Sequence, residues 1–258
     1  MFERIFKIGS ILLVLLAIVG CDSVSYKGVD SEIVISISEE LPSRELKMHF
    51  KTTRIYDVYD NQIKLSWRKT QMGFDVLFQG VLETGMLTAI GPATATINLG
   101  ALNTGTYQLT LRNEQETFKG QLFVVNDKYT IRLNSNSGFQ VQNSPLNRIP
   151  DNTIWGLVGY HTEETTPLVQ SFFSELIELG VMKKSFAPGD YNRFQIDKDG
   201  DIINYNGGYW FNQAFIFYYS EDSSELDKFL KQWSELHGTT MSIRIYTAKG
   251  EQFFSWRY

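Results

Sequence analysis

The sequence predicts two domains, an all-β sandwich followed by an α+β domain that contains a duplicated β-α-β-β unit. Three observations support this prediction. Apolar and polar residues alternate with a period of two through residues 30–133, helical periodicity begins only after residue 160, and turn-forming residues cluster at residues 134–152. We therefore place the first domain at residues 30–133, a junction at 134–152 and the second domain at 153–258.

The first domain is predicted to consist of short strands. Stretches of five to nine residues with alternating polarity recur between polar or glycine-containing turns, which is typical of an antiparallel sandwich. The predicted strands are residues 32–37, 46–50, 63–67, 74–82, 95–99, 107–111 and 118–125. Residues 128–133 either close this domain or open the next one.

One segment of the first domain carries a motif. Leu102 and Tyr107 lie five residues apart in the segment LNTGTYQL. This spacing resembles the tyrosine corner of immunoglobulin-like and fibronectin-type sandwiches, in which a tyrosine hydroxyl bonds back to upstream backbone. The resemblance covers eight residues and implies an Ig-like fold. The two cysteines typical of immunoglobulin domains are absent.

The second domain opens with an apolar strand at residues 154–160 and an amphipathic helix at residues 166–179. We expect Thr165 to be the N-cap of this helix and Gly180 to end it. Its apolar stripe consists of Leu168, Phe172, Leu176 and Leu179.

The same order of elements then recurs. The first unit ends in a hairpin at residues 193–196 and 202–205, and the second comprises a strand at 214–219, a helix at 224–237 and a hairpin at 243–246 and 252–256. This doubled β-α-β-β order resembles GyrI-like and SOUL small-molecule-binding domains, which implies a cleft between the repeats. The alternative is two unrelated α+β units that look alike because the repertoire of elements is small.

The N-terminus carries a targeting signal. Arg4 and Lys7 precede a continuous apolar stretch at residues 11–19, which is too short to span a bilayer. Residues 16–21, LAIVGC, resemble the lipobox of the type II signal of bacterial lipoproteins. The resemblance implies cleavage after residue 20 and diacylglyceryl transfer to Cys21, with residues 21–29 as a tether. Cys21 is the sole cysteine in the sequence, so it has no disulfide partner within the chain.

The predicted lipid anchor indicates where the protein is located and gives it one partner, the membrane. The lipobox places the protein in a bacterial cell envelope, anchored through the Cys21 lipid. Asp22 resembles an inner-membrane retention signal of enterobacterial lipoproteins, but lineages differ in this rule. Which membrane carries the protein therefore stays open.

Charge and composition exclude several classes of partner. The whole chain has 24 basic and 29 acidic residues, and removal of residues 1–20 takes away two basic residues and one acidic residue, which leaves a net charge near −6. The sequence has no basic run, which argues against nucleic acid as a partner. His49, His161 and His237 lie far apart without metal-ligand spacing, so we expect no metal site and no other cofactor.

Neither the acidic segment at residues 197–201 nor any set of catalytic residue types predicts a metal site or an active site. Residues 197–201, DKDGD, carry oxygens at alternate positions like the start of a calcium loop, but Ile202 occupies the place of its glycine. A hairpin turn explains this segment better. The sequence contains no serine elbow, catalytic cysteine or carboxylate pair that we recognise, so we predict no catalytic residue and do not expect an enzyme.

The best ligand-binding candidate lies at residues 206–213, where glycines, aromatic rings and amides occur together. We select Asn206, Tyr209, Trp210 and Asn212, because flat faces and hydrogen-bonding amides suit a sugar or a peptide. The competing interpretation, which the sequence favours, is that Tyr209, Trp210 and Phe211 enter the core at the start of a strand.

The expected function is therefore a non-catalytic binding, scaffolding or assembly role at the membrane surface, with an envelope protein or a small ligand as partner. One alternative is a glycan or peptide binder that uses the second domain. Another is a hydrolase of envelope polymers. The sequence does not identify the ligand, the partner or the oligomeric state.

Overall fold

The computed structural model describes residue 29 and residues 31–56, 61–82, 90–135, 137–203, 205 and 207–258. Strands take up 50% of the described residues and helices 16%, so the predicted β-rich fold is confirmed. The signal and Cys21 lie outside the described residues. Among the residues described, no helix is long and apolar enough to cross a membrane.

The elements, in chain order, are β1 (Ile33–Glu40), β2 (Glu45–Tyr56), β3 (Gln62–Lys69), β4 (Gly73–Leu82), β5 (Gly91–Ala101), β6 (Gly105–Arg112), β7 (Thr117–Val124), β8 (Lys128–Leu133), β9 (Phe139–Val141), β10 (Leu146–Asn147), β11 (Thr153–Tyr160), the 3₁₀ turn η1 (Glu163–Thr165), α2 (Thr166–Glu178), β12 (Gly189–Asp190), β13 (Gln195–Ile196), β14 (Ile202–Ile203), β15 (Phe211–Tyr218), α3 (Ser223–His237), β16 (Ser242–Thr247), β17 (Gln252–Phe254) and the 3₁₀ turn η2 (Ser255–Arg257).

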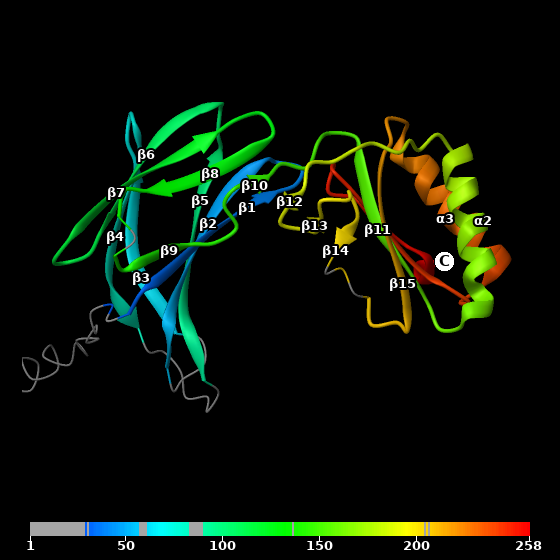
Figure 1. Ribbon diagram of the computed structural model, residues 1–258, viewed down its shortest axis with the longest axis horizontal. Coiled ribbons are helices and arrows are strands. Elements are labelled where there is room, and N and C mark those ends of the chain that lie inside the picture. Colours follow the sequence, from blue (N-terminus) through cyan, green and yellow to red (C-terminus); the bar gives the residue numbers. More distant parts are fainter. Residues whose placement is uncertain are drawn as a thin grey trace, which may run out of the picture.

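The larger sheet runs in the order β14-β13-β12-β10-β8-β7-β6-β4-β3-β5-β2-β1-β9. Its hydrophobic core forms because alternate residues point inward. Ile35 and Ile37 of β1 and Met48 and Phe50 of β2 are buried, whereas the residues between Ile35 and Ile37 and between Met48 and Phe50 are partly exposed. Figure 1 shows β1 to β9 gathered on one side of the molecule.

The expectation of an antiparallel arrangement at residues 30–133 is met by most strand pairs but not by all. The pairs β1–β9, β3–β5, β4–β6 and β10–β12 are parallel, so the large sheet is mixed. The β4–β6 pair can be parallel because β5 lies between these strands in the sequence and pairs along its length with β2. Period-two alternation reveals which residues face the core, but it does not reveal strand direction.

The smaller sheet has the order β15-β11-β16-β17, and its ladders are antiparallel. Every residue of its central strand β11 is buried. Helices α2 and α3 cover one face (Figure 1), where Phe172, Leu226 and Trp233 pack into one apolar cluster with the sheet. Gly180 and Gly238, which follow the two helices, adopt positive φ angles of 102° and 60°.

Thr165 lies at the N-cap position of α2, as the sequence predicted, but its side chain makes no capping hydrogen bond. It already has helical backbone angles, because the turn η1 extends the helical conformation ahead of α2. Its hydroxyl lies 3.3 Å from that of Thr162 and caps no backbone amide. The sequence did not reveal that the capping bond would be missing, because a short 3₁₀ turn before a helix has no clear sequence signal.

The two predicted β-α-β-β units differ in where their hairpins lie. In the second unit, β16 and β17 belong to the smaller sheet, but β13 and β14 of the first unit belong to the larger one. Phe186, Tyr191 and Phe194, from the long connection after α2, pack instead with Trp155 on the face of the smaller sheet that lies away from the helices. Figure 1 shows β12 to β14 between β10 and the smaller sheet.

Candidate functional site

The predicted binding segment lies at the start of β15. Tyr209 is half-buried, and its ring rests on the backbone of Gly159, since a Cβ atom added to that glycine would lie 2.2 Å from Tyr209 Cδ2. The side-chain amide of Asn212 donates a 2.8 Å hydrogen bond to the Tyr209 carbonyl oxygen. These contacts fix the Tyr209 ring. Asn206 lies outside the described residues.

Trp210 does not enter the core, so that sequence-based interpretation is wrong for this residue. Its side chain is 85% exposed. The inward positions are taken by its neighbours, because Tyr209 covers Gly159 and Phe211 stacks on Tyr160 at a centroid distance of 5.3 Å. The interpretation does hold for Phe211, which packs against the apolar cluster beneath α2 and α3.

A pocket of about 290 Å³ opens beside Tyr209. It lies where the end of β11, the loop between α3 and β16, and the turn η2 come together. We call it the Tyr209 pocket. Its lining residues are Gly159, His161, Tyr209, Gly238, Thr239, Thr240, Met241, Ser242, Ser255 and Trp256.

The aromatic rings of the pocket are held in place by other residues. Trp256 is 52% exposed and stacks on Phe254, with ring centroids 4.7 Å apart and planes 16° apart. The guanidinium of Arg244 lies 5.3 Å from the centre of the Trp256 ring. On the other side, the ring centres of His161 and Tyr209 are 5.2 Å apart. These contacts hold the Trp256 and Tyr209 rings at the wall of the pocket.

The polar groups of the pocket are mostly neutral hydroxyls. Among the described residues, the lining includes no aspartate, glutamate, lysine or arginine. The hydroxyl of Ser242 is buried and has no hydrogen-bond partner within the described part of the chain. Buried polar groups are normally satisfied, so this hydroxyl is an exception among the polar groups of the lining. Rings and hydroxyls together suit a neutral, amphipathic ligand of about one sugar ring in size.

The sequence analysis selected Tyr209 and Asn212, whose side chain bonds to the Tyr209 backbone, but it did not select the residues on the opposite wall of the pocket. His161, Ser242 and Trp256 come from three separate segments and meet only through the pairing of β11 with β15 and β16. The one sequence signal that could have indicated this wall is an aromatic residue close to the C-terminus, Trp256. Trp210, although selected from the sequence, is not among the residues that line the pocket.

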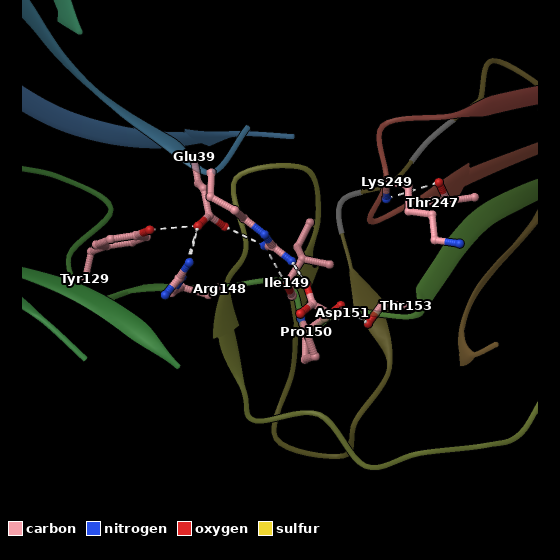
Figure 2. Close-up of polar contacts among 10 residues, drawn as sticks. Glu39, Tyr129, Arg148, Ile149, Pro150, Asp151, Thr153, Thr247 and Lys249 are labelled. Atoms are coloured by element: carbon pink, nitrogen blue, oxygen red, sulfur yellow. Dashed lines mark hydrogen bonds and ion pairs between the residues drawn. The ribbon is translucent and has the colours of Figure 1, made fainter. Parts of the chain in front are cut away.

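A second group of polar residues centres on the buried carboxylate of Glu39, which is 6% exposed. It accepts hydrogen bonds from Tyr129 at 2.7 Å, from Arg44 at 2.9 Å and from Arg148 at 3.0 Å. Arg44 also donates to the carbonyl oxygen of Ile149 and to Asp151. We call Glu39, Arg44, Tyr129, Arg148 and Asp151 the Glu39 cluster (Figure 2).

The geometry of the Glu39 cluster indicates a structural role. Burial, and then the hydrogen bond to Glu39, raise the pKa of Tyr129 above its ordinary value, so Tyr129 stays a neutral donor. Both Glu39 oxygens are engaged, and the carboxylate does not line the Tyr209 pocket. The cluster links the β1–β2 turn to the segment that leads into β11, as Figure 2 shows.

The acidic segment at residues 197–201 forms the predicted hairpin turn. The Asp197 carboxylate accepts hydrogen bonds from the backbone amides of Asp199 and Asp201, each at 2.9 Å, and Gly200 has a φ of 92°. These contacts satisfy the turn internally. In the described residues, no group of three or more histidine, cysteine, aspartate or glutamate side chains is arranged to hold a metal ion.

In comparisons with known proteins, no protein family model matches the chain, and no curated protein or solved structure is significantly similar to it.

Proposed function

We propose that this protein is a membrane-anchored cell-envelope lipoprotein with a non-catalytic binding role, and that the Tyr209 pocket takes a neutral saccharide ring. The lipobox and Cys21 support the anchor. The observation that carries the binding role is the pocket, in which preformed aromatic faces lie beside uncharged hydroxyls. Saccharides present both apolar C–H faces and hydroxyls, so they match such a lining.

We also propose that residues 30–133 form an Ig-like unit and residues 153–258 a second unit. The Tyr107 hydroxyl donates a 3.0 Å hydrogen bond to the Asn103 carbonyl oxygen, which is the contact that a tyrosine corner requires. The parallel β4–β6 pair departs from the antiparallel ladder expected of that fold. The two main apolar clusters are made of separate sets of residues, which supports the division. The third cluster, in which Leu41 packs with Trp155 and Phe194, and strands β12 to β14 of the larger sheet connect the two parts.

The anchor is tested by the variant Cys21→Ser. We expect labelled fatty acid to be incorporated into the wild type and not into the variant, which should accumulate as an uncleaved or mislocalised precursor. Equal labelling of the two proteins would contradict a lipid on Cys21.

The pocket is tested by titrating chito- and cello-oligosaccharides into the mature protein and following tryptophan fluorescence and heat. We expect binding that Trp256→Ala weakens at least about tenfold, because it removes a stacking face. Trp210→Ala is the matched control, since it removes an even more exposed tryptophan that lies outside the lining. No binding by the wild type, or equal losses in the two variants, would rule out this site.

A further inference from the structure

Among the described residues, the middle of the outer edge of β15 is open at Ala214 and Ile216. One side of β15 pairs with β11, and on the other side Tyr218 exchanges two 2.9 Å backbone hydrogen bonds with Met182. Amides of alternate residues point to the same side of a strand, so those of Ala214 and Ile216 face the same way as that of Tyr218. Within the described residues, neither Ala214 nor Ile216 has a backbone hydrogen-bond partner on that side.

A groove of about 450 Å³ runs along this edge, and we call it the β15 groove. Residues 213–217 form its floor. Phe173 and Ile177 of α2 line one wall, and Ile202 lines the other. Ile177 is 50% exposed, although it is a large apolar residue. The groove therefore offers apolar surface on both sides of a row of unpaired backbone groups.

The groove carries more positive than negative charge, because two lysines line it and Asp201 is the one acidic residue among the described residues of its lining. Lys183 and Lys184 line it just after Met182, at the end of β15 marked by Tyr218. The Lys184 ammonium lies 5.2 Å from the centre of the Tyr218 ring, which holds it at that end. An acidic side chain of an occupant would be attracted there.

We propose that the β15 groove binds an extended segment of a partner protein, which adds a fifth strand to the smaller sheet. Unpaired strand edges are natural templates for such β-strand addition, in which backbone bonds give affinity and alternate side chains give specificity. The segment presents apolar residues at alternate positions and an acidic residue to Lys183 and Lys184. This site is separate from the Tyr209 pocket and does not depend on saccharide binding.

A partner fits the groove better than a second copy of the chain does. If β15 paired with its own copy, the occupying strand would have the sequence FNQAFIFY, which contains no acidic residue. Such an occupant would supply no counter-charge to Lys183 and Lys184 beyond the Asp201 already in the lining. A partner segment with one carboxylate satisfies the backbone edge, the apolar walls and the lysines together.

The test uses a phage-displayed library of random eight-residue peptides, selected on the full mature chain. We expect enriched peptides to alternate apolar residues and to carry aspartate or glutamate near one end. Their affinity, measured by fluorescence anisotropy, should fall at least about tenfold in Ala214→Pro, which removes an outward amide that the β11 ladder does not use. Gln252→Ala, at an exposed position on β17 at the opposite edge of the same sheet, is the control and should bind as the wild type does.

A test on the peptide side does not depend on the folding of the proline variant. N-methylation of alternate peptide amides should abolish binding in one register and leave it intact in the other, because only one set of amides faces β15. The proposal is overturned if no peptide is enriched, or if the two N-methylated peptides bind equally well. It is also overturned if light scattering shows a dimer that Ala214→Pro converts to a monomer, because the occupant would then be a second copy.

Discussion

The Glu39 cluster and the Tyr209 pocket both gather aromatic and polar side chains, but they differ in how far those groups satisfy one another. Around Glu39, the carboxylate, the tyrosine hydroxyl and the two guanidinium groups form mutual hydrogen bonds. Around Tyr209, Trp256 is half-exposed and the Ser242 hydroxyl has no partner within the described residues. Groups that satisfy each other stabilise a fold, whereas preformed but unsatisfied groups remain available for a ligand.

The largest effect is expected from Glu39→Gln. The change leaves two guanidinium groups without their shared carboxylate, and breaking a buried ionic network from one side is strongly destabilising. We expect the free energy of unfolding, measured by urea denaturation, to fall by about 3 kcal/mol. Glu114→Gln, at an exposed hairpin, is the control and should change it by less than about 0.5 kcal/mol. A loss no greater than that of the control would show that the cluster is not structural.

Gly159→Ala should have an intermediate effect. The new methyl group would lie 2.2 Å from the Tyr209 ring, so the ring must move out of its position over β11. We expect a loss of about 1–2 kcal/mol in the free energy of unfolding, together with weaker oligosaccharide binding. Unchanged affinity would mean that the position of Tyr209 is irrelevant to the ligand.

Protonation of His49 should have a smaller effect on the free energy of unfolding, because this side chain is only partly buried. Its ring lies 2.7 Å from the Ser38 hydroxyl and 3.0 Å from that of Thr96, and burial followed by the charge of Lys47 lowers its pKa below the ordinary 6.5. The stabilisation is therefore present above about pH 6.5 and is lost as the pH falls toward the lowered pKa.

Urea denaturation across this pH range compares the wild type with His49→Gln. We expect the free energy of unfolding of the wild type to fall more on acidification than that of the variant. Equal losses would mean that another group is responsible for the acid sensitivity.

The smallest effect is expected from Trp210→Ala. A core tryptophan would cost about 3–5 kcal/mol when truncated, which is the outcome that the sequence favoured. Because the side chain is 85% exposed, we expect a change within about 0.5 kcal/mol. A thermal melt decides between these values, and a large loss would contradict the observed exposure.

Local features of this chain could be predicted from its sequence. Each strand predicted in residues 32–133 overlaps one of β1 to β8, and the two predicted helices coincide with α2 and α3 to within about a residue. Periodicity is a property of neighbouring residues, so it is visible without knowledge of the fold. Tyr209 was found for the same reason, because its glycines and amides are near it in the sequence.

Features that depend on distant contacts could not be predicted. Glu39 and Arg148 are 109 residues apart, and the walls of the Tyr209 pocket meet only when β11 pairs with β15 and β16. The exposure of Trp210 depends on which of its neighbours fills the space over β11. The open edge of β15 depends on the long connection after α2, which pairs with β15 at Met182 alone among the described residues.

The central claim is that the Glu39 cluster stabilises the fold and that the Tyr209 pocket is built for a ligand. Urea denaturation of Trp256→Ala beside Glu39→Gln tests this claim most directly. Because Trp256 is 52% exposed, we expect its truncation to cost about 1 kcal/mol, well below the loss of about 3 kcal/mol for Glu39→Gln. A loss for Trp256→Ala equal to or greater than that for Glu39→Gln would contradict the claim, because the pocket aromatics would then be part of the core.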